Sequence, residues 1–176
     1  MTDASGALLF YVRQKAFKLK ESVTVFRDAE QTQPLYRIAA DRVLDISAQY
    51  RIDEDGGAPI GVLQRHGMRS LWRAHYEVHR GGAPALLIRE ENPWVKLLDG
   101  LLGEIPILGL FTGYVLHPAY RLTRAAGGGT LLRAVKQPAL FESRYLIERP
   151  QELGPADQTL AVLAFLMMLL LERSRG

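Results

Sequence analysis

Much of the chain alternates between apolar and polar residues, in short runs separated by turn residues. The alternation extends from Leu44 to Ile52, from Trp72 to Val78, and from Tyr114 through Tyr120 to Leu122. An extended strand with this pattern has one apolar face and one mostly polar face. Such half-buried strands are typical of antiparallel sheets.

A hairpin-like unit recurs along the chain. Units begin at Gln49 (QYRIDEDGGAPIGVLQR), His75 (HYEVHRGGAPALLIREE) and Ala119 (AYRLTRAAGGGTLLRAVKQ), and a shorter one begins at Arg144 (RYLIERPQELGP). Each has a tyrosine, an apolar residue two positions later, charged residues, and a turn with Gly or Pro. The earlier segment VTVFRDAEQTQPLYRIAAD has the same form. We therefore expect about ten strands, joined as successive hairpins.

The most apolar run lies near the C-terminus, from Leu160 to Leu171. Ala, Leu and Met dominate it, and we expect a helix over 157–173. The run covers about 18 Å as a helix, whereas a membrane span needs about 20 residues to cross about 30 Å. A helix without a polar face must be enclosed on all sides. We expect it to fill the core; a membrane anchor and an oligomerisation helix are the alternatives.

Together these patterns predict an all-β protein with one central helix. A sheet of about ten twisted strands tends to curl or close. A wide barrel needs something to fill it, and the terminal helix would supply that filling. We expect a single domain, 1–176, that forms a closed antiparallel β-barrel around the hydrophobic C-terminal α-helix.

The opening of the chain resembles a known family. FYVRQKAFKLKESVTVFRDAEQTQPLYRI is similar to the start of the LURP-one-related family, in the tubby C-terminal-like superfamily. The residues that carry the likeness are Val12, Gln14, Lys15, Val23, Val25 and Asp28. The resemblance implies a barrel of about 10–12 strands around a central helix. It also implies association with membrane lipids, because tubby proteins bind phosphoinositide head groups. No lipid-binding motif of that superfamily is visible here, so the resemblance assigns no site residues.

One segment, residues 92–113, departs from the repeat. NPWVKLLDGLLGEIPILGLFTG is longer and more apolar than a hairpin turn. We expect a short helix near 94–102 that caps the barrel or packs on its outside. The alternative is an insert that contacts a membrane, a partner or a second copy of the chain, because large exposed apolar patches mark interfaces. The side chains that would do so are Trp94, Ile105, Ile107, Leu108 and Leu110.

Composition narrows the classes of function. The formal net charge of +3 over 176 residues is too small to identify a nucleic-acid-binding protein. The aromatic residues lie mainly on apolar faces, which also argues against nucleic acid. The chain has no cysteine, which excludes disulfides and thiolate catalysis. The N-terminus lacks a signal-peptide pattern. We expect a cytoplasmic protein that can lie peripherally on a membrane.

The sequence offers no catalytic motif. It has no G-x-S-x-G elbow, no P-loop, and no G-x-G-x-x-G between a strand and a helix. The glycine pairs and triplet at Gly56, Gly81 and Gly127 lie between expected strands and are interpreted as turns. Carboxylates are scattered over strand ends and turns, where solvation explains them. We expect neither enzymatic activity nor a cofactor.

The histidines are His66, His75, His79 and His117. His75 and His79 would share the polar face of one strand, about 13 Å apart, too far for one ion to bind both. His66 or His117 could join one of them across strands. The simpler interpretation is a set of surface imidazoles, and no metal site is predicted.

Basic residues are the remaining candidates for a binding site. One group surrounds the first turn and the other surrounds the turn after the fifth strand; either could bind phosphate or an anionic lipid surface. The simpler alternative is that they solvate strand edges and oppose aggregation. The residues are Arg13, Lys15, Lys18 and Lys20, and Arg65, Arg69, Arg73 and His75.

These observations favour a non-enzymatic binding protein that recognises an anionic ligand, such as a phospholipid head group at a membrane surface. The alternative is a structural or protein-interaction module that uses the insert at 92–113 and has no small-molecule ligand.

Overall fold

A computed structural model describes residues 1–14, 22–41, 49–66, 74–91, 119–137 and 144–173. The expectations for the insert at 92–113, including its apolar contact residues, lie outside these ranges.

The described chain forms a ten-stranded sheet followed by one helix, and the strands follow one another in chain order across the sheet. Every neighbouring pair is antiparallel, so the sheet is a series of hairpins, as the repeat predicts. The strands are β1 (Tyr11–Gln14), β2 (Ser22–Phe26), β3 (Pro34–Ala40), β4 (Gln49–Glu54), β5 (Pro59–Arg65), β6 (His75–Arg80), β7 (Ala83–Glu90), β8 (Ala119–Arg124), β9 (Thr130–Gln137) and β10 (Arg144–Glu148).

The alternation of apolar residues is confirmed as a difference between two faces of the sheet. In β6, Tyr76 and Val78 are fully buried, while His75, Glu77 and His79, which alternate with them, are only partly buried. The same pattern appears in β2, β4 and β8. The described strands start at Gln49, His75 and Ala119, and most of the earlier residues of the expected runs lie outside the described ranges.

Four hairpins share one irregularity, which explains the sequence repeat. The pairing of β2, β4, β6 and β8 with the following strand shifts register near the turn. In three of them the residue opposite the shift is a proline: Pro34, Pro59 and Pro84. Proline has no N–H to donate, so it fits a position where the ladder is interrupted. Such bulges increase twist and bend a strand, which favours a curved sheet.

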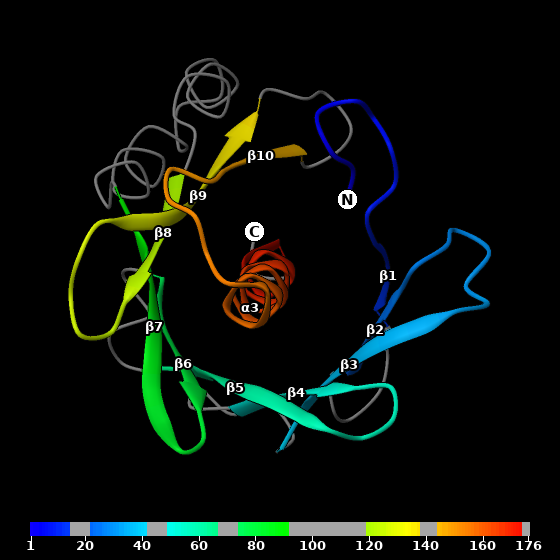
Figure 1. The fold of residues 1–176 in the computed structure, drawn as a ribbon, viewed down its shortest axis with the longest axis horizontal. Coiled ribbons are helices and arrows are strands. Elements are labelled where there is room, and N and C mark those ends of the chain that lie inside the picture. The colour runs from blue at the N-terminus through cyan, green and yellow to red at the C-terminus, as the bar shows by residue number, and fades with distance from the viewer. Residues whose placement is uncertain (15–21, 42–48, 67–73, 92–118, 138–143, 174–176) are drawn as a thin grey trace, which may run out of the picture.

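The sheet curves around helix α3, Pro155–Arg173, which lies in the middle of the ribbon view (Figure 1). The helix begins two residues before the expected position at 157. Pro155 is its first residue, where a missing N–H costs nothing, and the carbonyl of Gly154 accepts the N–H of Gln158 at 2.8 Å.

Helix α3 is longer than the apolar run that was used to argue against a membrane span. By length and composition alone, its 19 residues can cross a membrane, although the apolar run within it is shorter. The core helix of a globular protein meets the same two criteria. Here half of the apolar window is buried inside the protein, and its side chains meet those of the strands. The structure therefore supports the core position.

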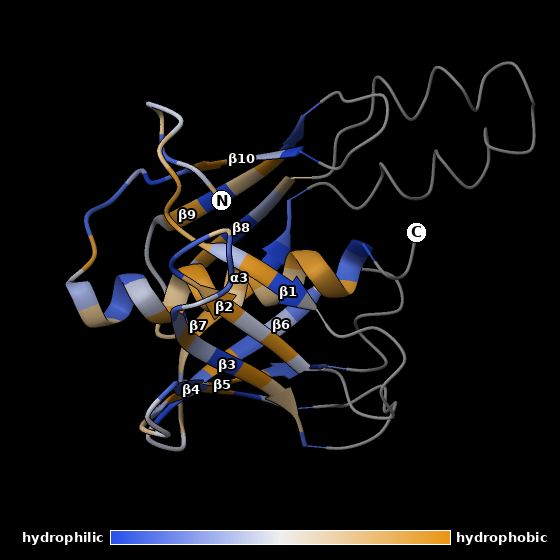
Figure 2. Cartoon of the chain, turned by 90° about the vertical axis from the view of Figure 1, so that its right-hand side faces the viewer, coloured by the Kyte–Doolittle hydropathy of each residue, from blue (hydrophilic) through white to orange (hydrophobic). Residues whose placement is uncertain are grey.

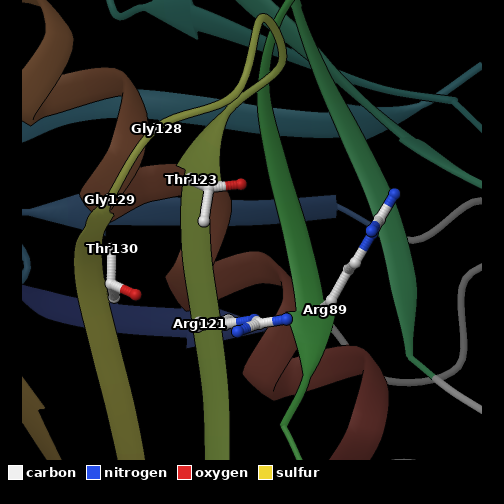
Figure 3. A pocket seen from close by; sticks show the side chains of 6 residues that line it. All are labelled: Arg89, Arg121, Thr123, Gly128, Gly129 and Thr130. Atoms are coloured by element: carbon white, nitrogen blue, oxygen red, sulfur yellow. The ribbon is translucent and has the colours of Figure 1, made fainter.

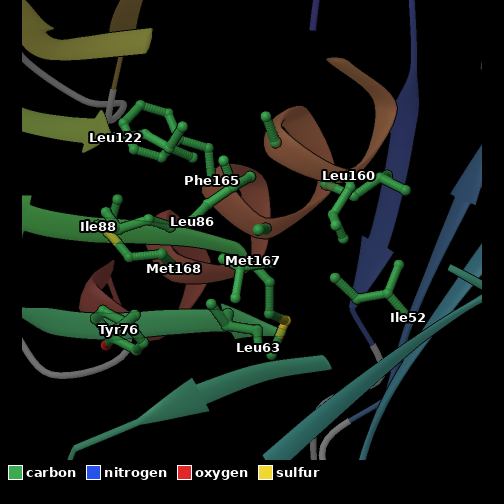
Figure 4. Packing of buried hydrophobic residues seen from close by; sticks show 14 of the residues in the cluster. Ile52, Leu63, Tyr76, Leu86, Ile88, Leu122, Leu160, Phe165, Met167 and Met168 are labelled. Atoms are coloured by element: carbon green, nitrogen blue, oxygen red, sulfur yellow. The ribbon is translucent and has the colours of Figure 1, made fainter. Parts of the chain in front are cut away.

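Side chains from both the sheet and the helix fill the core (Figure 4). Phe165, Met167 and Met168 are fully buried, as are Ile52, Ile88 and Leu122 on the strands. Figure 2 shows the helix as hydrophobic along its middle and hydrophilic at its two ends. Only its ends are therefore suited to polar contacts.

Two polar contacts hold the ends of α3 against the same strand. At the start, the Arg80 guanidinium pairs with the Asp157 carboxylate and donates to the carbonyl of Ala156 at 2.9 Å. At the end, the Tyr76 hydroxyl donates to Glu172 Oε1 at 2.7 Å. Both Tyr76 and Arg80 lie on β6, so this strand fixes the position of the helix along its own axis.

The expected closure into a barrel is not seen. β1 and β10 end the sheet, and within the described ranges they pair only with β2 and β9. Their inward apolar residues, such as Val12 and Ile147, are only partly buried. The helix likewise has one partly buried stripe, formed by Val162, Leu166, Leu169 and Leu170. The architecture is thus a ten-stranded antiparallel sheet that curves around one helix.

Gly61 on β5 provides a test of this packing. A Cβ at this position would lie 2.7 Å from the carbonyl oxygen of His79 and 2.8 Å from Leu160 Cδ1 of the helix. Because the oxygen belongs to the backbone of β6, it cannot rotate away. We expect Gly61→Ala to lower the free energy of unfolding by about 1–3 kcal/mol, measured by urea denaturation.

Gly56→Ala is the matched control, because Gly56 has open space around it and no positive φ. It should leave the free energy of unfolding within about 0.5 kcal/mol of the original. Equal stability of the two variants would contradict the close approach of α3 to β5.

Candidate functional site

The structure describes only three of the eight expected site residues. Arg13 lies on β1, and its Nη1 donates to Gln31 Oε1 at 3.1 Å. Arg65 and His75 lie on β5 and β6. The others, Lys15, Lys18, Lys20, Arg69 and Arg73, lie outside the described ranges. The cluster around the first turn is therefore represented by one arginine that has a neutral partner.

Arg65 and His75 do not share a surface. Arg65 is the cross-strand partner of Tyr76, which is fully buried. Arg65 also lies two residues after buried Leu63 on β5, and alternate residues of a strand share a face. Its Cβ therefore points to the helix side of the sheet. His75 is next to Tyr76 and points to the outer side. The sequence places the two residues around one turn, but the pleat separates them onto opposite faces.

A different set of arginines meets on the outer face. Arg89 on β7 is the cross-strand partner of Arg121 on β8, which in turn is the partner of Arg133 on β9. Each is flanked by buried residues, as Arg121 is by Tyr120 and Leu122, so all three point outward. Like charges directly opposite one another destabilise a sheet unless something neutralises them.

Arg133 is neutralised. Its Nε lies 3.0 Å from Glu91 Oε1, and its Nη1 lies 3.2 Å from Glu148 Oε2. The hydrogen bonds to Glu91 and then Glu148, together with their charges, raise the pKa of Arg133 above its usual value. This arginine is therefore part of a local ion-pair network.

Arg89 and Arg121 are not neutralised within the part of the chain that the structure describes, where neither guanidinium has a hydrogen bond or an ion pair. Both are exposed and line one groove of about 430 Å³ (Figure 3). In this view, Arg121 points toward β7, and Arg89 points away from β8. The remaining lining residues are Thr123, Gly128, Gly129 and Thr130.

The β8–β9 turn shapes one side of this groove. Gly127 and Gly128 have φ of 95° and 119°, values that residues with a side chain rarely adopt. Opposite one another below the turn stand Thr123 and Thr130, whose hydroxyls can donate or accept hydrogen bonds. The groove thus combines two guanidiniums with two hydroxyls and the side-chain-free backbone of Gly128 and Gly129.

This arrangement suits an anion. A guanidinium presents several N–H donors in a fixed plane that matches phosphate or carboxylate oxygens. Two such groups lining one groove favour a ligand with more than one charged oxygen. Arg89 and Arg121 did not stand out in the sequence because they belong to different repeats. The available signal was that each occupies an outward position in its strand.

A second cluster lies on β5 and β6, around Glu77. Glu77 Oε1 lies 3.1 Å from His66 Nε2 and 4.0 Å from His75 Nε2, and Oε2 lies 3.4 Å from His79 Nε2. Burial raises the pKa of Glu77, but contact with His66 and the charges of His66, His79 and His75 outweigh it, and the net pKa is below the usual value. From the sequence, His66 was only one of two histidines that could join another across strands, surface imidazoles were the preferred interpretation, and Glu77 was not singled out.

Fold and groove define a class of protein: a curved antiparallel sheet around a core helix, with an arginine pair exposed on its outer surface. Comparisons with known proteins find no family model that matches the chain, no similar curated protein and no similar solved structure. The assignment of function therefore rests on the site itself.

The difference between Arg121 and Arg133 predicts opposite effects on stability. Arg121→Gln removes a charge that faces Arg89 and Arg133, so the free energy of unfolding should stay within about 0.5 kcal/mol or rise. Arg133→Gln leaves Glu91 and Glu148 without their cation and should lower it by about 0.5–1 kcal/mol. Urea denaturation at low salt measures both values.

The same pair of variants at high salt provides the control, because exposed charges are screened there and both differences should shrink. A clear loss of stability in Arg121→Gln would mean that Arg121 has a structural partner, and it would contradict the assignment of Arg121 to a ligand site.

Proposed function

We propose that this protein is a non-enzymatic binding protein whose outer surface recognises a phosphate-bearing ligand, with the head group of an anionic phospholipid as the favoured source. The groove between β7 and β9 is the proposed site. The observation that carries the proposal is the pair Arg89 and Arg121, which lie in cross-strand register and lack a counter-charge in the described chain.

The cost of this arrangement supports a ligand. Two guanidiniums on directly paired positions repel each other. The neighbouring Arg133 shows that the same sheet can neutralise an arginine when carboxylates are placed beside it. Among the described residues Arg89 and Arg121 have none, so an external anion is the natural partner of this pair.

The form of the groove favours phosphate. Thr123 and Thr130 line it alongside the arginines, so a bound phosphate group could receive both charged and neutral hydrogen bonds. The site lies on the outside of the sheet, away from the core helix, and a head group could enter it without any separation of strands. A peripheral position on a membrane is thus compatible with the intact fold.

The resemblance to the LURP-one-related family is also a proposal. The curved sheet and the enclosed C-terminal helix support it. A fully closed barrel would require pairing between β1 and β10, and the partly buried apolar residues on both strands suit such a neighbour. Slow hydrogen exchange at Tyr11–Gln14 amides that do not face β2 would support closure.

Flotation with lipid vesicles tests the proposed function. The vesicles contain phosphatidylcholine with graded amounts of phosphatidylserine or of a phosphoinositide. We expect binding that rises with anionic lipid and fades with salt. Arg121→Gln should weaken it by about 10- to 100-fold, since a hydrogen bond to a charged group contributes about 1.5–3 kcal/mol.

Arg27→Gln is the matched control. Arg27 is exposed at the β2–β3 turn, remote from the groove in sequence and on the sheet. A basic residue near an anionic membrane contributes about 1 kcal/mol, so this variant should weaken binding by at most about fivefold. Equal effects of the two variants would indicate a diffuse attraction and contradict a site at the groove.

Inorganic phosphate, measured by calorimetry, distinguishes the two sources of the anion. Binding of vesicles with no detectable binding of phosphate supports a lipid head group, whereas tight binding of phosphate alone supports a soluble ligand. Failure of both would overturn the proposal and favour the protein-interaction alternative that uses the insert at 92–113.

A further inference from the structure

The histidine cluster on β5 and β6 has the arrangement of a metal-binding site. His66 follows the last residue of β5, and its N–H donates to the carbonyl of His75 at 3.2 Å. The two residues thus face one another across the hairpin. Glu77 is two positions beyond His75, on the same outer face of β6. His75 and Glu77 are neighbours on one face of β6, and His66 lies across from them. The three side chains therefore surround one point.

The distances support this arrangement. The ligand atoms of His66, His75 and Glu77 all lie within 4.8 Å of one another. Ligands held about 2.0–2.2 Å from a tetrahedral ion lie about 3.4 Å apart. The contacts of Glu77 Oε1 with the Nε2 atoms of His66 and His75, at 3.1 and 4.0 Å, lie on either side of that value. Small rotations of the side chains are enough to reach it.

Two nitrogens of the cluster are buried without a well-formed hydrogen bond in the described chain. Nε2 of His66 and Nε2 of His79 lie 3.1 and 3.4 Å from the oxygens of Glu77, but neither contact has hydrogen-bond geometry. An ion shared between His66 and Glu77 would satisfy the His66 nitrogen. The rings of His66 and His75 meet edge to face, with centroids 5.2 Å apart, which brings both imidazoles to the same side of Glu77.

We propose that His66, His75 and Glu77 bind one divalent transition-metal ion, with Zn²⁺ as the favoured ion. Two imidazole nitrogens and a carboxylate oxygen are ligands that zinc commonly takes. The carboxylate is suited to the role, because both of its oxygens already face histidine nitrogens of the cluster. Three protein ligands is also the number found where a water or a substrate takes the fourth position.

His79 has a different place in the arrangement. It does not belong to the set of mutually close ligand atoms, and its Nε2 lies 3.4 Å from the second carboxylate oxygen of Glu77. A residue in that position can orient the carboxylate without contacting the ion. The proposal therefore makes different predictions for His79 and for the three ligands.

The alternative is that the histidines serve only as charged partners of Glu77. In that case, the cluster would bind protons rather than a metal, and added zinc would have no saturable effect. This inference does not depend on the proposed anion groove, although Arg89 is the cross-strand partner of His75 and the two sites adjoin.

Isothermal titration of ZnCl₂ into the tag-free, chelator-treated full-length chain tests the proposal. We expect one ion per chain, together with a concentration-dependent rise in the unfolding temperature. His66→Gln and His75→Gln should each weaken binding by about 100-fold or more, because even an outer-shell partner costs about 10- to 100-fold. Each variant is first shown to unfold cooperatively in the absence of metal.

Two controls separate the possible outcomes. Arg27→Gln, at the remote β2–β3 turn, should bind zinc as the unaltered chain does, and His79→Gln should weaken binding by less than His66→Gln does. Co²⁺ should give the intense visible absorption of a four-coordinate site, and His75→Gln should abolish it. Absence of saturable binding, or equal zinc affinity in the unaltered chain and His66→Gln, would overturn the proposal. An equal loss in His79→Gln and His66→Gln would overturn the three-ligand assignment.

Discussion

The enclosure of one apolar helix determines the rest of this structure. α3 has no polar face along its middle, so every side of it needs apolar contact. Its polar groups are confined to the ends, where Arg80 pairs with Asp157 and the Tyr76 hydroxyl donates to Glu172. A flat sheet could cover only one side. The ten strands therefore must curve, and their inner faces must carry small or apolar residues that follow the helix surface, as Gly61 does against Leu160.

Curvature of this kind explains why the chain repeats itself. Each of four hairpins interrupts its ladder near the turn, and prolines stand opposite three of these interruptions. A bulge bends and twists the strand that contains it. Because consecutive hairpins bend in the same way, their effects add along the sheet. The glycine turns and the prolines of the sequence repeat are thus the local means by which the sheet curves around α3.

Most of the fold could be predicted from the sequence because its signals are local. The alternation in β6 and the apolar run of α3 are visible within short windows. The site depends on register, which connects residues far apart in sequence. Arg89 and Arg121 meet only because β7 and β8 pair in one register, and a shift by one residue would turn one of them inward. Arg65 and His75 show the converse case. They flank one turn in the sequence and were grouped for that reason, but their side chains face opposite sides of the sheet.

The inner face of the sheet packs against α3, so the candidate binding sites lie on its outer face. A charged group on the inner side needs a polar partner near an end of α3, as Arg80 has in Asp157 and as Glu172 has in the Tyr76 hydroxyl. Outer positions carry no such cost. On strands β5 to β9, the outer positions carry Glu77 with its histidines and the arginines Arg89, Arg121 and Arg133. The cross-strand pair of His75 and Arg89 joins the two groups. The sheet holds the Glu77 cluster and the arginines on the same outer surface. Ligands bound there would not contact the core.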